Sequence, residues 1–169
     1  MSKKIFIGRA LLLGTTLLAV HASQATTAGN TFQVTATVVS ACTVAGTALN
    51  FGSNIDPLAA ATPLDASSTL SVQCTNTTPY SVSLSAGANA GGASNFTARA
   101  MKSGSNSLGY QLYLDAGRSS IWGDGTGSST VSGTGSGSTQ SLTIYGRLPS
   151  LNNVVPGSST DTVTVTVSY

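Results

Sequence analysis

The sequence predicts an all-β protein. Ser, Thr, Gly, Ala and Val dominate its 169 residues, and only 7% of the residues are charged. This composition lacks sustained runs of strong helix formers and favours half-buried, pleated strands. Short segments of alternating apolar and polar residues recur between Gly, Pro and Asn residues, a pattern typical of a β-sandwich.

The N-terminal 25 residues have the features of a secretory signal peptide. Three basic residues precede an apolar run at residues 10–20, and Ser23 and Ala25 form a small-x-small cleavage site. The apolar run is shorter than the roughly 20 residues that a membrane-spanning helix needs. We therefore expect export, with cleavage after Ala25 and one mature domain.

Cleavage at this point leaves a nearly neutral chain. It removes three of the seven basic residues and the only histidine, His21, so that four basic residues remain beside five aspartates. A basic face for nucleic acid is therefore not expected. Without histidine or glutamate the usual nucleophile–base pairs cannot be assembled, and we expect neither an enzyme nor a cofactor or metal site.

The first alternating segment is TFQVTATVV at residues 31–39. It places Phe32, Val34, Ala36 and Val38 on one face and polar residues on the other, as in a strand with one apolar face. A very similar segment, DTVTVTVSY, ends the sequence.

Further alternating segments fill the chain between these two. After two short segments come STLSVQC, PYSVSLS and LGYQLYL, and later QSLTIYGRL, each bounded by turn residues. The Gly- and Ser-rich residues 123–140 are expected to form a long flexible hairpin loop. In order, strands are expected at residues 41–44, 48–51, 68–74, 79–85, 95–101, 108–114, 119–122, 140–148 and 160–169.

Two cysteines, Cys42 and Cys74, remain in the mature chain. In an exported protein they most simply form a disulfide with each other. Closing a loop of about 33 residues would constrain the unfolded chain by roughly 3–4 kcal/mol.

Seven short motifs follow one another along the chain: CTV at residues 42–44, LNFG at 49–52, SVQC at 71–74, LGYQLYLD at 108–115, IWGDG at 121–125, YGRLP at 145–149 and the terminal DTVTVTVSY. Taken in this order, they resemble the spore-coat-U-type pilin domain of archaic, Csu-type chaperone–usher pili. The resemblance implies an incomplete immunoglobulin-like β-sandwich that lacks its last strand. It also implies that a periplasmic chaperone holds the subunit until the N-terminal segment of the next subunit completes the sandwich by donor-strand exchange.

This resemblance assigns roles to the two similar segments. Residues 26–40 would be the donor segment, with Phe32, Val34, Ala36 and Val38 entering a neighbour's groove, and residues 41–169 the pilin domain. The sequence ends with a predicted strand, whose free edge we expect to recruit another strand. The residues expected to line this acceptor groove and to contact the chaperone are Val163, Val165, Val167 and Tyr169.

The implied protein is a structural pilus subunit, of the shaft or adaptor type, that supports adhesion and biofilm formation. Its expected partners are neighbouring copies of itself or related pilins, a periplasmic chaperone and an outer-membrane usher, with no nucleic acid. It would be exported through the periplasm to the cell surface.

Alternatives remain open at this stage. Residues 31–39 could be an ordinary first strand of their own sandwich. The protein could be a spore or cell-surface coat protein, or a monomeric secreted sugar-binding sandwich that uses Trp122, Tyr110 and Tyr113 as stacking platforms. A small outer-membrane barrel is a further alternative, although most predicted strands are shorter than the 9–11 residues of a spanning strand.

The signal peptide leads to a first prediction. The mature protein should begin at Thr26, because Ser23 and Ala25 suit the small pockets of a signal peptidase. Intact-mass measurement of protein collected from the cell surface tests this. A mass that still includes residues 1–25 would contradict both the cleavage and the near-neutral charge.

Overall fold

The computed structural model describes residues 24–126 and 128–169. The chain divides into two units, Met1–Thr37 and Val38–Tyr169. In the first unit, residues 24–37 are exposed and form neither helix nor strand. The predicted signal peptide lies almost wholly outside the described residues. No helix within the described ranges is long and apolar enough to cross a membrane.

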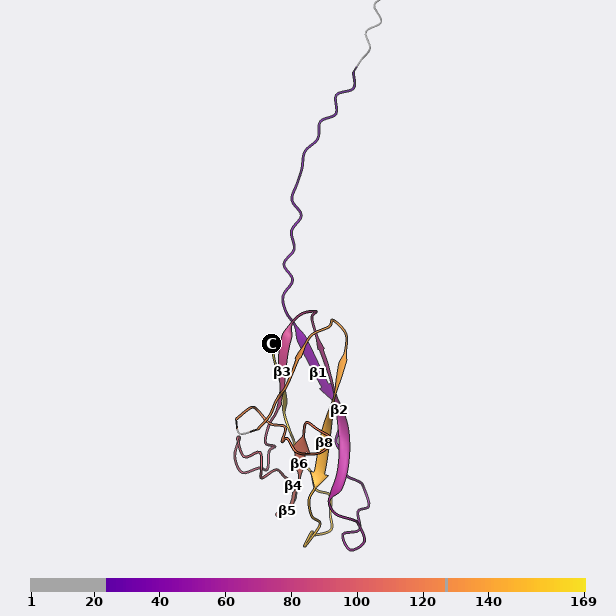
Figure 1. Ribbon diagram of the computed structural model, residues 1–169, viewed down its shortest axis with the longest axis vertical. Coiled ribbons are helices and arrows are strands. Elements are labelled where there is room, and N and C mark those ends of the chain that lie inside the picture. Colours follow the sequence, from indigo (N-terminus) through magenta and orange to yellow (C-terminus); the bar gives the residue numbers. More distant parts are fainter. Residues whose placement is uncertain (1–23, 127) are drawn as a thin grey trace, which may run out of the picture. The chain divides into compact units, whose positions relative to one another are not determined.

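The second unit is built of antiparallel strands, and its described residues contain no helix, which confirms the all-β prediction (Figure 1). A four-stranded sheet has the order β1-β2-β8-β6, a three-stranded sheet has the order β7-β3-β9, and β4 and β5 form a separate hairpin. The strands are β1 (Cys42–Gly46), β2 (Leu64–Cys74), β3 (Pro79–Leu84), β4 (Ala100–Ser103), β5 (Asn106–Gly109), β6 (Gln111–Tyr113), β7 (Val131–Thr134), β8 (Gln140–Leu148) and β9 (Val165–Ser168).

The two larger sheets pack around one shared core, as expected of a sandwich. Leu70 and Val72 of β2 and Ile144 of β8 meet Val82 and Leu84 of β3 in a single buried cluster. Such clusters of apolar side chains are the main source of stability in a domain of this size.

Trp122 is the largest fully buried side chain of the core. It is 0% exposed, and its indole Nε1–H donates a 3.0 Å hydrogen bond to the main-chain oxygen of Val82. A buried indole needs such a partner because an unsatisfied donor would be costly. Trp122 therefore ties the segment after β6 to the centre of β3.

Small residues let other segments approach the strands closely. A Cβ atom at Gly146 of β8 would lie 2.8 Å from Leu49 and 2.9 Å from Phe51. These two half-buried side chains pack on the face of β8 that is turned toward the core. Strand formation was predicted at residues 48–51, but the segment packs on the sheet through these side chains and pairs with no strand.

Other predicted boundaries were also wrong in part. The hairpin loop expected at residues 123–140 contains β7, which pairs with β3 from Pro79↔Thr134 to Val82↔Val131. Residues 95–99 form turns and precede β4, and residues 119–122 make only isolated bridges. The expected strand at residues 160–169 is regular only in β9. The expected strand at 108–114 is divided at Tyr110, because β5 before it pairs with β4 and β6 after it pairs with β8.

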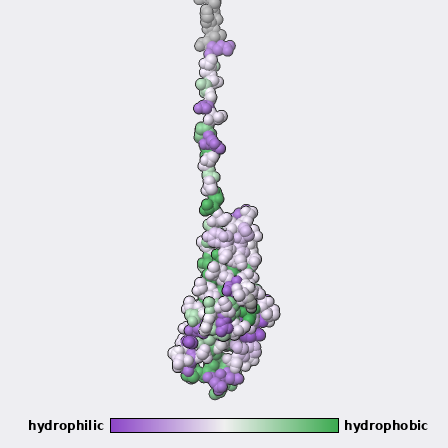
Figure 2. All heavy atoms as spheres, turned by 90° about the vertical axis from the view of Figure 1, so that its left-hand side faces the viewer, coloured by the Kyte–Doolittle hydropathy of each residue, from purple (hydrophilic) through white to green (hydrophobic). Residues whose placement is uncertain are grey.

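The domain surface matches the composition. Figure 2 shows a surface dominated by weakly polar residues, with strongly hydrophilic side chains gathered mainly in one half of the domain. A surface with so few charges has little capacity for electrostatic recognition of a highly charged partner.

The position of Trp122 leads to a second prediction. Trp122→Ala should lower the free energy of unfolding by about 3–5 kcal/mol, because it removes a fully buried aromatic side chain and leaves a cavity. Denaturant unfolding of the disulfide-bonded protein measures the loss. Leu58→Ala is the matched control, since Leu58 is 97% exposed and its truncation should change stability by less than about 0.5 kcal/mol. Equal losses in the two variants would contradict the described core.

Candidate functional site

The candidate site is formed by the outer edges of β1 and β9. Each is the last strand of its own sheet: β1 pairs only with β2, and β9 pairs only with β3. Their Cα atoms come within 8 Å of one another, yet the described strands share no hydrogen bond. The sandwich thus has two unpaired edges that lie side by side.

The registers fix the directions of these two strands. Cys42 of β1 lies opposite Cys74, where β2 ends, and β3 begins after the short turn that follows. Ser168 of β9 lies opposite Ser81, near the start of β3. Strand β1 therefore starts, and β9 ends, at the same end of the domain, where Figure 1 places the C-terminus beside β3. The two edges run antiparallel to each other.

The residues of β9 whose side chains face the core are also the ones whose main-chain N–H and C=O groups lie on the free edge. Thr164 accepts a hydrogen bond from the N–H of Ser85 (2.9 Å), so the alternation of an antiparallel ladder turns Thr166 toward β3 as well. The N–H and C=O groups of Val165 and Val167 consequently point away from β3, along the open edge.

Half-buried and exposed residues alternate along the terminal segment. Val163, Val165 and Val167 are half-buried and pack against the core, while the threonines between them are exposed. Tyr169 is 61% exposed and belongs to no core cluster. Half-buried apolar side chains on an unpaired edge leave surface that another strand could cover.

The edge of β1 has the same arrangement. Ala41 and Thr47 bond to Thr75 and Thr69 on the β2 side, at 2.9 and 3.1 Å. By alternation, the main-chain groups of Cys42 and Val44 face the open edge. The predicted disulfide between Cys42 and Cys74 is present and joins this edge strand to β2.

The predicted donor residues are strongly exposed. Phe32, Val34 and Val38 are 87%, 81% and 88% exposed, and Ala36 is exposed as well. Residues 31–39 form no strand in the single chain. Large apolar side chains at such exposure are unusual unless a partner covers them.

A half-buried polar cluster fixes the start of the terminal segment. Asp161 accepts hydrogen bonds from the Tyr110 hydroxyl (2.7 Å) and from the Asn89 amide (2.9 Å). Burial, followed by this bond to Asp161, raises the pKa of Tyr110 well above its usual range. Tyr110 therefore stays protonated and acts as a donor that holds residue 161 in place.

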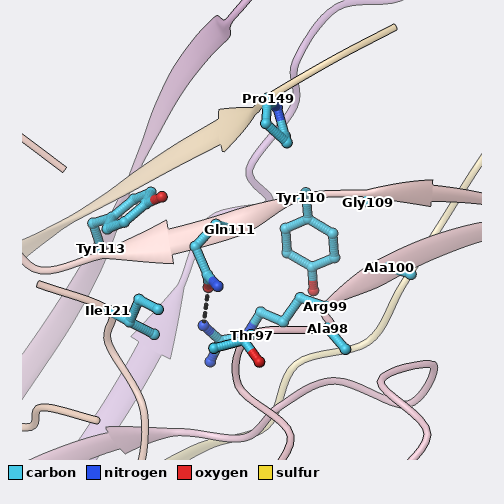
Figure 3. A pocket seen from close by; sticks show the side chains of 10 residues that line it. All are labelled: Thr97, Ala98, Arg99, Ala100, Gly109, Tyr110, Gln111, Tyr113, Ile121 and Pro149. Carbon is cyan, nitrogen blue, oxygen red and sulfur yellow. Dashed lines mark hydrogen bonds between the residues drawn. The ribbon is translucent and has the colours of Figure 1, made fainter. Parts of the chain in front are cut away.

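Arg99 occupies the base of a shallow hollow beside β6 (Figure 3). Its side chain is 1% exposed and donates to Gln111 Oε1 (2.8 Å) and to the main-chain oxygens of Ser85 (2.7 Å) and Trp122 (2.8 Å). Burial lowers its pKa. Because the guanidinium is engaged by the protein itself, this cluster has the character of a structural cross-link between loops.

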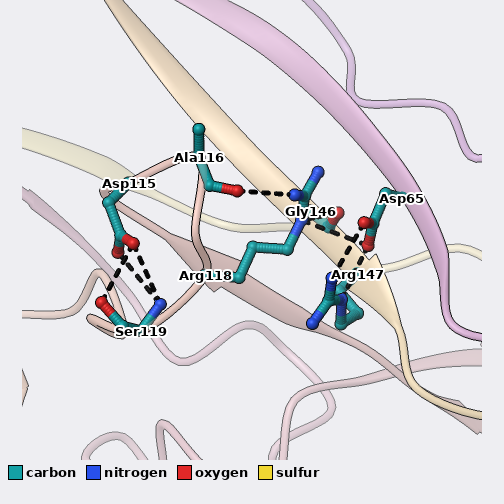
Figure 4. A network of polar contacts seen from close by, with 7 residues as sticks. All are labelled: Asp65, Asp115, Ala116, Arg118, Ser119, Gly146 and Arg147. Atoms are coloured by element: carbon teal, nitrogen blue, oxygen red, sulfur yellow. Dashed lines mark hydrogen bonds and ion pairs between the residues drawn. The ribbon is translucent and has the colours of Figure 1, made fainter.

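An exposed polar network lies across β2 and β8 (Figure 4). Arg147 forms a two-point pair with Asp65, at 2.7 and 2.9 Å, and Arg118 approaches the same carboxylate at 3.1 Å. The hydrogen bond from Arg147 lowers the pKa of Asp65, and the same bond raises the pKa of Arg147. Solvent screening makes such exposed pairs weak contributors to stability.

The aromatic residues considered for sugar stacking are mostly inside the protein. Trp122 is fully buried and Tyr110 is 7% exposed, while Tyr113 is half-buried. In the described part of the chain no three His, Cys, Asp or Glu residues gather as a metal site would require. The clusters around Arg99 and Asp161 were not predicted from the sequence, because the residues that form them are scattered along the chain without a recognisable spacing.

Comparisons with known proteins agree with this architecture. The solved structure of the CsuC–CsuE chaperone–tip adhesion subunit pre-assembly complex, from archaic chaperone-usher Csu pili of Acinetobacter baumannii, contains a similar chain with a TM-score of 0.58 and 27% identity. The match covers 79% of this chain and spans 40% of the length of that chain.

A relative of similar length supports the same assignment. "Protein U" of Myxococcus xanthus is 31% identical over 172 residues, which cover 95% of each chain. Residues 28–166 match the family model described as the Spore Coat Protein U domain, as the sequence motifs suggested. The chain belongs to the Spore Coat Protein U domain family.

Proposed function

We propose that this protein is a structural subunit of an archaic chaperone–usher pilus that polymerises by donor-strand exchange. Residues 1–25 would direct export, residues 26–40 would be the donor segment, and residues 41–169 would be the pilin domain. The main supporting observation is the pair of unpaired edges on β1 and β9, combined with an exposed alternating segment in the same chain.

The edges and the segment are chemically complementary. An inserted strand would gain hydrogen bonds from the free main-chain groups of Val165 and Val167, and its apolar side chains would cover the half-buried valines. Burial of Phe32, Val34 and Val38, at roughly 1.5–3 kcal/mol each, with a smaller contribution from Ala36, gives about 5–10 kcal/mol before ordering costs.

The need for a chaperone follows from the same edges. An unpaired apolar edge promotes aggregation unless something covers it. A strand between two others also needs about 10 Å between its neighbours, whereas Cα atoms of β1 and β9 come within 8 Å. A periplasmic chaperone would hold these edges apart and covered, and an outer-membrane usher would then release each subunit into the fibre.

The fibre would lie at the cell surface, where it would support adhesion and biofilm formation. A second candidate is a surface coat protein, which the family description favours. Both candidates are exported sandwiches, and they differ in whether strand exchange links the subunits into fibres.

Substitutions in the donor segment test polymerisation. Val34→Arg should abolish surface fibres and the heat-resistant ladder of multimers, because it places a charge in the neighbour's apolar groove. It should leave the soluble subunit in the periplasm, since Val34 is 81% exposed in its own chain. Thr35→Arg, on the opposite face, is the matched control and should keep at least about half of the fibres. Microscopy and detergent gels before boiling score both, and normal fibres in Val34→Arg would refute the donor role.

A substitution in the terminal strand should act differently. Val165→Arg should reduce the yield of soluble subunit itself, because Val165 packs against the domain's own core and a buried charge there costs several kcal/mol. The amount of soluble periplasmic protein, measured beside Val34→Arg and Thr166→Arg, provides the test. If Val34→Arg lowers this yield as much as Val165→Arg does, residues 31–39 belong to their own sandwich and the coat-protein candidate becomes the better one.

A further inference from the structure

A third unpaired edge lies on strand β7, away from the edges of β1 and β9. In the sheet order β7-β3-β9, β7 pairs only with β3, and β3 separates it from β9. We name the outer side of Val131–Thr134 the β7 edge. A strand that binds there leaves the unpaired edge of β9 accessible.

The hydrogen bonds around β7 determine which main-chain groups lie on the β7 edge. Gly135 donates its N–H to the oxygen of Thr78 at 2.7 Å, on the side of β3. By the alternation of an antiparallel ladder, Gly133 is also bonded to β3, and the N–H and C=O groups of Ser132 and Thr134 point outward. Both of these residues are exposed. Their outward groups are therefore open to another strand.

The β7 edge lacks the features that usually keep edge strands from pairing. Natural edges are often protected by charged side chains, above all lysine, or by proline. No charged residue occurs at 125–146 or at 66–98, the segments that contain β7 and its partner β3, and β7 contains no proline. The edge of β5 differs, because Lys102 lies directly opposite Ser107 there.

Gly133 leaves space at the middle of the β7 edge. It lies opposite Tyr80 of β3, and a Cβ atom at residue 133 would be 2.6 Å from both the ring and the hydroxyl of Tyr80. The tyrosine ring thus occupies the position of the missing side chain. No side chain of residue 133 stands between β7 and a strand that approaches from outside.

These features make the β7 edge complementary to a second copy of itself. If two β7 strands run antiparallel about a two-fold axis at Gly133, each Ser132 lies opposite Thr134 of the other copy. Each such pair exchanges two main-chain hydrogen bonds. The two Gly133 residues then form the closer, non-hydrogen-bonded pair, with Cα atoms about 4.5 Å apart, and glycine fits this spacing without a clash. No like charges meet across the pair.

We propose that the β7 edge binds the β7 edge of a second copy of this chain, which joins the two three-stranded sheets into one continuous sheet. The pairing uses neither the edges of β1 and β9 nor residues 31–39. It therefore goes beyond the proposed function and does not depend on strand exchange. Because β7 has four residues, the pairing is weak, and two copies associate side by side where they are concentrated.

Disulfide trapping tests the register of this pair. Ser132→Cys and Thr134→Cys are made in separate full-length mature chains that also carry Val34→Arg, so that the donor segment does not link copies. In the proposed pair, positions 132 and 134 of different copies have Cα atoms about 5.5 Å apart, within the range of a disulfide. Identical positions lie two residues out of register, about 8 Å apart, which is beyond that range.

A mixture of the two cysteine chains, oxidised at about 100 μM, should therefore form covalent dimers that neither chain forms alone. The yield in the mixture should exceed that of either single chain by at least about fivefold. Mass spectrometry should find the new bond between positions 132 and 134, with the disulfide between Cys42 and Cys74 intact. Equal yields in the mixture and in the single chains would overturn the proposal, as would a mixture that stays monomeric.

Proline provides an independent test of the outward main-chain groups. Ser132→Pro removes an outward N–H but leaves the bonds between Gly133 and β3 in place, so the domain should still fold. The matched control is Ser107→Pro on the edge of β5. Ser107 is exposed, and its main-chain groups also face outward, since those of its partner Lys102 are bonded to Thr160 instead.

Sedimentation of both proline variants, again with Val34→Arg and at up to about 1 mM, measures self-association. Ser132→Pro should weaken it at least about tenfold, whereas Ser107→Pro should leave it unchanged. An equal effect of the two substitutions would overturn the proposal. Thermal unfolding shows whether each variant is folded, and if Ser132→Pro is not, the cysteine mixture decides alone. Neither measurement involves strand exchange, so failure of the proposed function would leave both results interpretable.

Discussion

Strand β9 is hydrogen-bonded on one side only, and the arrangement of the rest of the domain depends on this unpaired edge. Its valines pack against the core and its threonines face solvent, so it contributes to the sandwich as an ordinary strand does. Its outer main-chain groups have no partner among the described strands. In such a strand the side chains that stabilise the core and the main-chain groups open to pairing belong to the same residues, so a change in one affects the other.

The low charge and high Gly and Ser content have a structural explanation in this setting. At Gly133 a Cβ atom would lie 2.6 Å from the ring of Tyr80, and at Gly135 it would approach Thr75 even more closely. Gly133 of β7 is the cross-strand partner of Tyr80, so the missing side chain makes room for the tyrosine ring. Buried hydrogen bonds from Arg99 then join the loops that the strands leave unconnected. This solution leaves few surface charges and few groups with catalytic capability.

Much of the fold could be predicted from the sequence, because alternation is a local property. Segments such as β3 and β8, with a clear period of two, were placed to within a residue or two. Predictions were wrong where long-range packing determines the local structure. Strand β7 lies in a Gly- and Ser-rich stretch that has no local apolar pattern, although it pairs with β3. Leu49 and Phe51 look like strand residues but are used as a cover over Gly146. The disulfide was predictable because the sequence contains only two cysteines. The Arg99 and Asp161 clusters were not, since their partners are brought together only by folding.

The two similar segments, TFQVTATVV and DTVTVTVSY, show most clearly what the local pattern leaves undecided. Both alternate small apolar residues with threonine, and both suit an edge position equally well. Their flanking contacts differ. The bonds of Asp161 to Tyr110 and Asn89 deliver the second segment onto β3 in a register that turns its valines inward. The end of the first segment is held at Ala41, which exchanges two hydrogen bonds with Thr75 just after β2. Two segments of similar pattern therefore have different surroundings: the valines of the second pack against the domain's own core, whereas Phe32, Val34 and Val38 of the first stay exposed.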